Sequence, residues 1–278
     1  VTTGINNTLI GSNAGDALTT GGNNVAIGKS ALSTEDTGYG SVAIGTYALE
    51  DQDAGNAYNT AVGHETGRDI TSGLYNTLIG AYSGDALTTG GNNTAVGYQA
   101  LSAEDGNGNN TAIGYQTLNA QNAGADAYNV AVGHQAGLLV STGTYNTLIG
   151  GNAGDALTTG SRNVAVGFNA LTSEDGHGYN TAIGYDSLKS LNAGADSYNT
   201  ALGYRSGYLV STGVNNTLIG GLAGDALTTG ESNVAIGKEA LSTEDTGHHN
   251  TAVGFQALKD LNYDGSGYNT AVGRRAGY

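Results

Sequence analysis

A short alternation of polar and apolar residues recurs along the whole chain. It is a pentad of Asn, Thr or Val, Ala or Leu, a branched aliphatic residue and Gly, first present at residues 7–11 and again at residues 24–28. The pentad occurs sixteen times, and only Ser41 replaces its leading Asn. Successive pentads lie 17 residues apart, except that every fourth interval is 18 or 19. So short and regular a period predicts a repeat architecture.

Each pentad is predicted to form a β-strand, because β-branched residues alternate within it and a Gly ends it. A second short strand is expected after the Gly, for example over residues 29–32, and a polar turn then leads to the next pentad. Two strands and two turns describe one coil of an all-β, parallel β-solenoid of about 16 coils of 17–19 residues, stacked about 4.8 Å apart. No segment has the spacing of an amphipathic helix. The positions expected to define the coil are Asn7, Ile10, Gly11, Asn24, Ile27, Gly28, Asn76, Ile79, Gly80, Asn146, Ile149, Gly150, Asn216, Ile219 and Gly220.

A longer period is superimposed on the coils. Residues 76–145 and 146–215 are identical at 44 of 70 aligned positions, so the duplicated unit is four coils long. We therefore expect residues 1–278 to form a single continuous array of four blocks of about 70 residues. The chain opens and closes inside a repeat, which indicates a piece of a longer fibre.

The two faces of the predicted strand differ in the size of their side chains. Alternation places the second and fourth pentad residues on one face, and we expect these, for example Val25 and Ile27, to form the core together with Leu32. The other face carries Ala or Leu at the middle of all sixteen pentads, and never a polar residue. This pattern predicts that neighbouring chains cover that face. The candidates for the interface are Leu9, Leu78, Leu148 and Leu218.

Composition excludes several classes of protein. The chain has 48 Gly and no Pro or Cys, and its net charge is −15. Fixed apolar positions argue against disorder. Without a basic stripe to neutralise phosphates, nucleic acid is not an expected partner. No apolar run approaches the roughly 20 residues of a membrane span, so we expect no membrane insertion by this segment.

The pentads Asn-Val-Ala-Ile-Gly and Ser-Val-Ala-Ile-Gly resemble the head repeats of YadA-like trimeric autotransporter adhesins, and similar repeats of phage tail fibres. The resemblance covers all sixteen pentads. It implies a left-handed parallel β-roll in which three copies pack side by side, and an extracellular location on a virion tail fibre or a cell surface. The sequence departs from those head repeats in two ways: its coil is longer, and Thr is frequent at the second pentad position. The coiled-coil stalk and membrane anchor of the adhesins are not in this sequence.

No residue pattern points to catalysis, a metal or a cofactor. The five His residues lack metal-ligand spacing, and the Gly/Asp-rich stretches lack the spacing of calcium-binding nonapeptides. The repeated Glu-Asp pairs, such as Glu174-Asp175, lie roughly 19 Å apart in successive blocks. We expect them to be solvated turns, so that a change at Glu174 should have little effect. Tyr residues that flank the pentads are expected to stack on neighbouring coils, with a binding surface as the alternative.

The sequence therefore predicts a structural protein that is not an enzyme. It would be a segment of a trimeric fibre that attaches a virion or cell to a host or other surface, with a host glycan or protein as a possible partner besides itself. The alternative is an ice-binding or other surface-binding solenoid, because Thr recurs on the strands. The extra residues of every fourth interval should form protruding loops. Candidate contact residues in these loops are Asp53, Asp126, Asp196 and Asp264.

Overall fold

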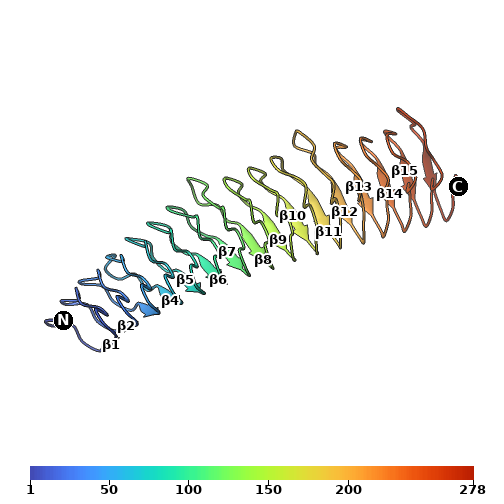
Figure 1. Ribbon diagram of the computed structural model, residues 1–278. Coiled ribbons are helices and arrows are strands. Elements are labelled where there is room, and N and C mark those ends of the chain that lie inside the picture. Colours follow the sequence, from blue (N-terminus) through green and yellow to red (C-terminus); the bar gives the residue numbers. More distant parts are fainter. The chain divides into compact units, whose positions relative to one another are not determined.

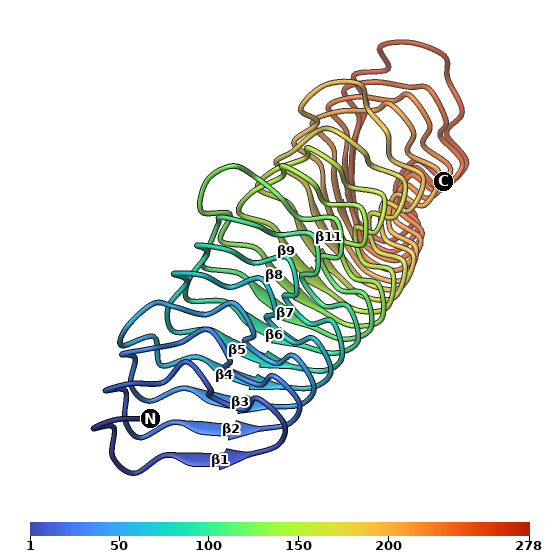
Figure 2. The ribbon, with the colours of Figure 1, turned by 60° about the vertical axis from the view of Figure 1, so that its left-hand side comes forward.

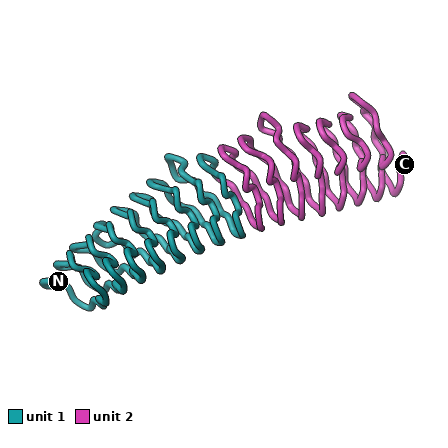
Figure 3. The backbone as a smooth tube through the Cα atoms, in the orientation of Figure 1, with its two compact units in different colours: residues 1–144 teal, residues 145–278 magenta.

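The computed structural model describes residues 1–278, which form a parallel β-solenoid without helices. The chain divides into two compact units, residues 1–144 and 145–278 (Figure 3). Each unit contains eight coils, and each coil contributes one three-residue strand (Figure 1). No helix of the kind that could cross a membrane is present. The predicted solenoid and its coil length are confirmed.

Within each unit every strand pairs in parallel with the strand of the next coil. The register joins equal pentad positions, as in Thr8↔Val25, Leu9↔Ala26 and Ile10↔Ile27. The strands of the first unit are β1 (Thr8–Ile10), β2 (Val25–Ile27), β3 (Val42–Ile44), β4 (Thr60–Val62), β5 (Thr77–Ile79), β6 (Thr94–Val96), β7 (Thr111–Ile113) and β8 (Val130–Val132). Those of the second are β9 (Thr147–Ile149), β10 (Val164–Val166), β11 (Thr181–Ile183), β12 (Thr200–Leu202), β13 (Thr217–Ile219), β14 (Val234–Ile236), β15 (Thr251–Val253) and β16 (Thr270–Val272).

The prediction of a second strand in each coil is wrong. Residues 29–32 form turns, and the backbone φ angles of Ser30 and Leu32 are both 52°. A left-handed backbone at alternate residues cannot pair as an extended strand. The segment instead bends sharply and directs Leu32 into the interior, where it is fully buried.

The strand faces are the reverse of those expected. The middle pentad residue points inward, so that Ala26 and Leu78 are fully buried, while Val25 and Ile27 are only partly buried. Leu148 and Leu218 are likewise fully buried within the single chain, and Leu9 is half-buried in the first coil. None of the four leucines lies on an outward face, so they are wrong as interface candidates.

The interior accepts a leucine in the strand because glycines make room for it. A Cβ atom on Gly67 would lie 2.7 Å from Leu78 Cδ1, and one on Gly84 would lie 3.0 Å from Leu78 Cδ2. In the coil of β6, whose strand carries Ala95, the position equivalent to Gly84 holds the fully buried Leu101. In the coil of β4 both positions are small, Ala61 and Gly67, and Leu78 of the next coil lies against Gly67.

Asparagine fixes which strand face points inward. The Asn24 N–H donates to Asn7 Oδ1 at 3.0 Å, and the Asn24 Nδ2 donates to the carbonyl of Gly38 at 2.7 Å. The Ser41 N–H continues the ladder by donating to Asn24 Oδ1 at 2.9 Å. Since the leading Asn is buried in this ladder, strand alternation also places the middle residue inside.

The last position of the pentad requires glycine for two reasons: its backbone has a positive φ angle, and the next coil leaves no room for a side chain. Gly97 has a φ of 140°, and a Cβ atom there would lie 2.1 Å from the carbonyl oxygen of Gly114 in the next coil. Any other residue would be strained and would clash with the stacked coil. The Asn and Gly positions thus explain why the pentad recurs so strictly.

Candidate attachment surface

The outward side of the strands is an uncharged surface with one apolar column, which we call the strand face. It consists of the second and fourth pentad residues, which are Thr or Val and Ile, Val or Leu, in every coil. The exposed fractions of Ile79 and Ile113 are 41% and 38%. No charged residue occupies either column in any coil. The chain's charge of −15 is therefore carried away from the strand face.

Runs of stacked aromatic rings lie beside the strand face, at the residue that follows the pentad. In the first unit the rings of Tyr98, Tyr115 and His134 stack with centroids 5.6 and 5.2 Å apart. In the second unit the rings of Phe168, Tyr185 and Tyr204 stack at 5.6 and 5.7 Å. The expectation that these rings stack on neighbouring coils is confirmed.

A second ladder, also in short runs, stands at the residue that precedes the pentad. The guanidinium carbon of Arg162 lies 5.6 Å from the centroid of Tyr145 and 5.4 Å from that of Tyr179. Tyr179 in turn stacks on Tyr198 at 4.8 Å. These side chains are exposed, so the ladder offers rings, hydroxyls and one cation at the edge of the strand face.

The extra residues of every fourth interval form exposed loops, as predicted. The loop near residue 195, drawn in gold, extends beyond the adjoining coils of its unit (Figures 1 and 2). Asp53, Asp126, Asp196 and Asp264 are all exposed. Asp126 and Asp196 also accept hydrogen bonds from the N–H groups of Gly108 and Gly178, at 3.1 and 3.0 Å. Their use in surface contact stays a prediction.

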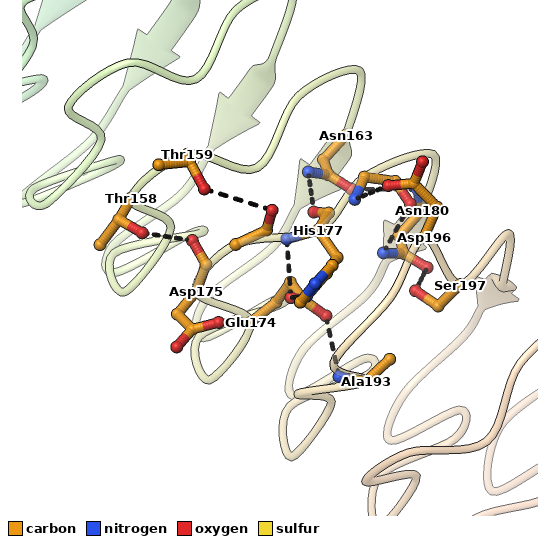
Figure 4. A network of polar contacts seen from close by, with 12 residues as sticks. Thr158, Thr159, Asn163, Glu174, Asp175, His177, Asn180, Ala193, Asp196 and Ser197 are labelled. Carbon is orange, nitrogen blue, oxygen red and sulfur yellow. Dashed lines mark hydrogen bonds and ion pairs between the residues drawn. The ribbon is translucent and has the colours of Figure 1, made fainter.

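The prediction that the Glu-Asp pairs are solvated is wrong for the glutamates. Glu174 is fully buried, whereas Asp175 is exposed. Glu174 Oε1 accepts the N–H of His177 at 3.0 Å and lies 3.2 Å from His177 Nδ1, and Oε2 accepts the N–H of Ala193 at 3.4 Å (Figure 4). The carboxylate thereby connects its own turn to the protruding loop of the next coil.

The same arrangement recurs in the other blocks. Glu35 accepts the N–H groups of Gly38 and Ala54, and Glu244 accepts those of Gly247 and Tyr263. In the second block, burial raises the pKa of the Glu104 carboxyl to about 7. One of its two oxygens has no hydrogen-bond partner, which adds to the cost of the charged form.

Two of these turns bring metal-ligating groups together. Ligand atoms of Glu174, Asp175 and His177 lie within 4.8 Å of one another, as do those of Glu35, Asp36 and Asp53. In both groups the buried Glu oxygens already accept N–H donors of the surrounding turn and loop. Hydrogen bonds to these Glu oxygens are therefore sufficient to hold the loops in place.

We expect Glu174→Ala to destabilise the second unit by about 2–4 kcal/mol, because it removes a fully buried side chain and leaves the partly buried N–H groups of His177 and Ala193 without an acceptor. The neighbouring change Asp175→Ala removes an exposed carboxylate and should alter stability by less than about 0.5 kcal/mol. Thermal unfolding compares the stabilities of the two variants, and hydrogen exchange at the Ala193 amide reports whether the loop is released locally. Equal effects of the two substitutions would contradict the role assigned to Glu174.

Sequence reasoning missed the strand face and the buried glutamates. The strand face was detectable, because an Asn retained at the head of fifteen pentads is more consistent with a buried ladder than with an exposed position. Burial of Glu174 left no comparable signal in the sequence. No protein-family model matches the chain, and a search of curated proteins found no match either.

Proposed function

We propose that the chain is a segment of a fibrous, homotrimeric appendage that attaches a virion or a cell to a host or other surface, as tail fibres and adhesins do. The observation that carries this proposal is the strand face, which is uncharged, presents a branched aliphatic residue in every coil and is unpartnered in the single chain. The resemblance of the pentads to YadA-like head repeats supports the same conclusion. The proposed location is extracellular.

The strand face has the chemistry of a permanent interface between copies. Obligate homo-oligomeric interfaces are more apolar than other protein surfaces, and their centres are depleted of charge. The fourth pentad residues form an apolar column through the eight coils of each unit, and neither they nor the second pentad residues include a charge. Contiguous apolar patches of this extent are unusual on monomers. The aromatic ladders beside the columns add residues that are enriched at interfaces.

Self-association is tested by the mass of the particle in solution. Light scattering coupled to size exclusion should give three times the 27.7 kDa of the chain. The pair Ile79→Asp and Ile113→Asp places two carboxylates on the strand face and should shift the mass toward that of the monomer. The pair Ser72→Asp and Thr142→Asp adds the same charge at exposed positions off the strands, and should leave the mass unchanged. A folded, monomeric wild-type chain would overturn the proposal.

A second candidate function is ice binding by the same face. Thr60, Thr77, Thr94 and Thr111 stand in register on four consecutive strands, so their hydroxyls form a row with the strand spacing. Val at the same position in β2, β3 and β8 interrupts such rows. Thermal hysteresis of the purified chain tests this candidate. A clear activity by a monomer would favour ice binding over the fibre.

A further inference from the structure

An open pocket of about 340 Å³ lies beside the three turns that precede β2, β3 and β4 in the first unit. Its lining residues are Asn23, Tyr39, Gly40, Asn56 and Tyr58. The volume is within the range of small-molecule sites. The pocket lies at the position before the pentad, and its form follows from the absence of a side chain at one residue there.

That residue is Gly40, which stands where the next two coils carry Tyr58 and Tyr75. These two rings stack with an interplanar angle of 2° and centroids 6.0 Å apart. A Cβ atom on Gly40 would lie 2.7 Å from Tyr58 Cδ1, so the ring face of Tyr58 that is turned away from Tyr75 borders the pocket. A second ring, Tyr39, is held by the hydrogen bond from its hydroxyl to the Thr20 carbonyl at 3.1 Å.

Two amides complete the pocket. Asn23 Oδ1 accepts Asn6 Nδ2 at 3.2 Å, which leaves the Asn23 Nδ2 group as a donor. Asn56 is exposed and occupies the position of Asp126 and Asp196 in the next two blocks, where the carboxylates accept a backbone N–H. In the first block the corresponding N–H, that of Tyr39, donates to the Gly55 carbonyl instead. The Asn56 amide is therefore not needed for that bond.

We propose that this pocket binds a single neutral hexose unit of a glycan. The apolar C–H face of a pyranose ring packs on an aromatic face, and planar amides donate to and accept from its hydroxyls. The pocket offers two rings, two amides and no carboxylate, amine or guanidinium. Because the chain carries a charge of −15, an acidic sugar would be repelled and a neutral one would not.

The other blocks lack this site and supply its control. Their residues at the positions of Tyr39 and Gly40 are Gly108 and Asn109, Gly178 and Tyr179, and His248 and His249. In the third block Tyr179 fills the ladder position and stacks on Tyr198. Both Gly40 and Tyr179 have a left-handed backbone, with φ angles of 77° and 64°. The exchange Tyr39→Gly with Gly40→Tyr therefore reproduces an arrangement that this fold already accommodates.

Saturation-transfer NMR with the methyl glycosides of glucose, galactose and mannose tests the proposal. We expect ring-proton signals from at least one of them on the wild-type protein, and a weaker signal from methyl glucuronide. The exchange variant should abolish the signal, and Asn56→Asp should weaken binding by about tenfold through loss of an amide donor. Tyr278→Ser, which removes an exposed ring outside the pocket, should leave binding unchanged.

The absence of a signal from all three hexosides would overturn the proposal, as would an unchanged signal in a folded exchange variant. If the exchange variant does not fold, Asn56→Asp decides, because it introduces the residue of the second and third blocks. Only the biological role of sugar binding rests on the proposed attachment function; the binding itself does not. The particle mass, measured on the same sample, reports on the trimer separately from sugar binding.

Discussion

Replacing Leu78 by Asp should unfold the coils around β5, whereas the same replacement of the adjacent Ile79 should leave them folded. Leu78 is fully buried between Gly67 and Gly84, and an unpaired carboxylate there should cost more than about 4 kcal/mol. Ile79 points outward with an exposed fraction of 41%, so a carboxylate at this position stays solvated in the single chain.

Circular dichroism and thermal unfolding of the two variants distinguish the strand faces. We expect loss of β-structure or a strongly lowered unfolding temperature for Leu78→Asp. We expect a near wild-type spectrum and a reduced particle mass for Ile79→Asp. The opposite ranking would mean that Val and Ile form the core and that Leu faces other chains.

The chain should unfold at a higher temperature at pH 5 than at pH 8. Burial raises the pKa of Glu104 to about 7, and those of Asp85 and Asp225 to about 6. Burial also raises the pKa values of Glu35 and Asp155. Each group binds its proton more tightly in the folded chain than in the unfolded chain. Stability is therefore highest below the unfolded pKa values and falls as the pH rises from about 4 to about 7.

The pKa of one group shifts in the opposite direction, and this group titrates below the range of pH 4 to 7. Hydrogen bonding to Lys259 lowers the pKa of Glu239 to about 2. Its contribution to stability is present above pH 4.5 and is lost only as the pH falls toward 2. We therefore expect the unfolding temperature to pass through a maximum near pH 4 to 5 and to decline on either side.

Glu104→Gln tests the origin of the decline above pH 5. The variant keeps an acceptor for Asn107 without the buried charge, so it should be more stable than the wild type at pH 8, by up to a few kcal/mol. Its unfolding temperature should also depend less on pH. The control is Asp105→Asn, at an exposed neighbour, which should keep the wild-type pH dependence. A wild-type profile that rises from pH 5 to pH 8 would contradict this account.

The sequence was sufficient to predict the solenoid, because the pentad glycine and asparagine each have one structural use. Gly97 needs its left-handed backbone and has no room for a side chain, and Asn24 joins adjacent coils. Both requirements recur once per coil, so their spacing gives the coil length. The exposure of the protruding loops was predictable for the same reason, since extra residues do not fit a fixed coil.

Side-chain size gave the wrong orientation of the strands. In most half-buried strands the larger apolar face points inward, and that expectation placed Val25 and Ile27 in the core. The coil here is too narrow for two large columns, and Leu32 from the opposite wall already fills it. Burial of Glu104 and Glu174 was not predictable, because it depends on N–H groups of turns whose geometry the sequence does not encode in any simple pattern.

The accessibility of a single thiol on the strand face tests the fibre model most directly. The chain has no Cys, so Ile113→Cys and Ala125→Cys each introduce one unique thiol, on the strand face and on a protruding loop. In the assembled protein the thiol at position 113 should react with a maleimide far more slowly than the thiol at position 125, and denaturant should remove the difference. Equally fast labelling of both positions in the native protein would show that nothing covers the strand face, and would contradict the model.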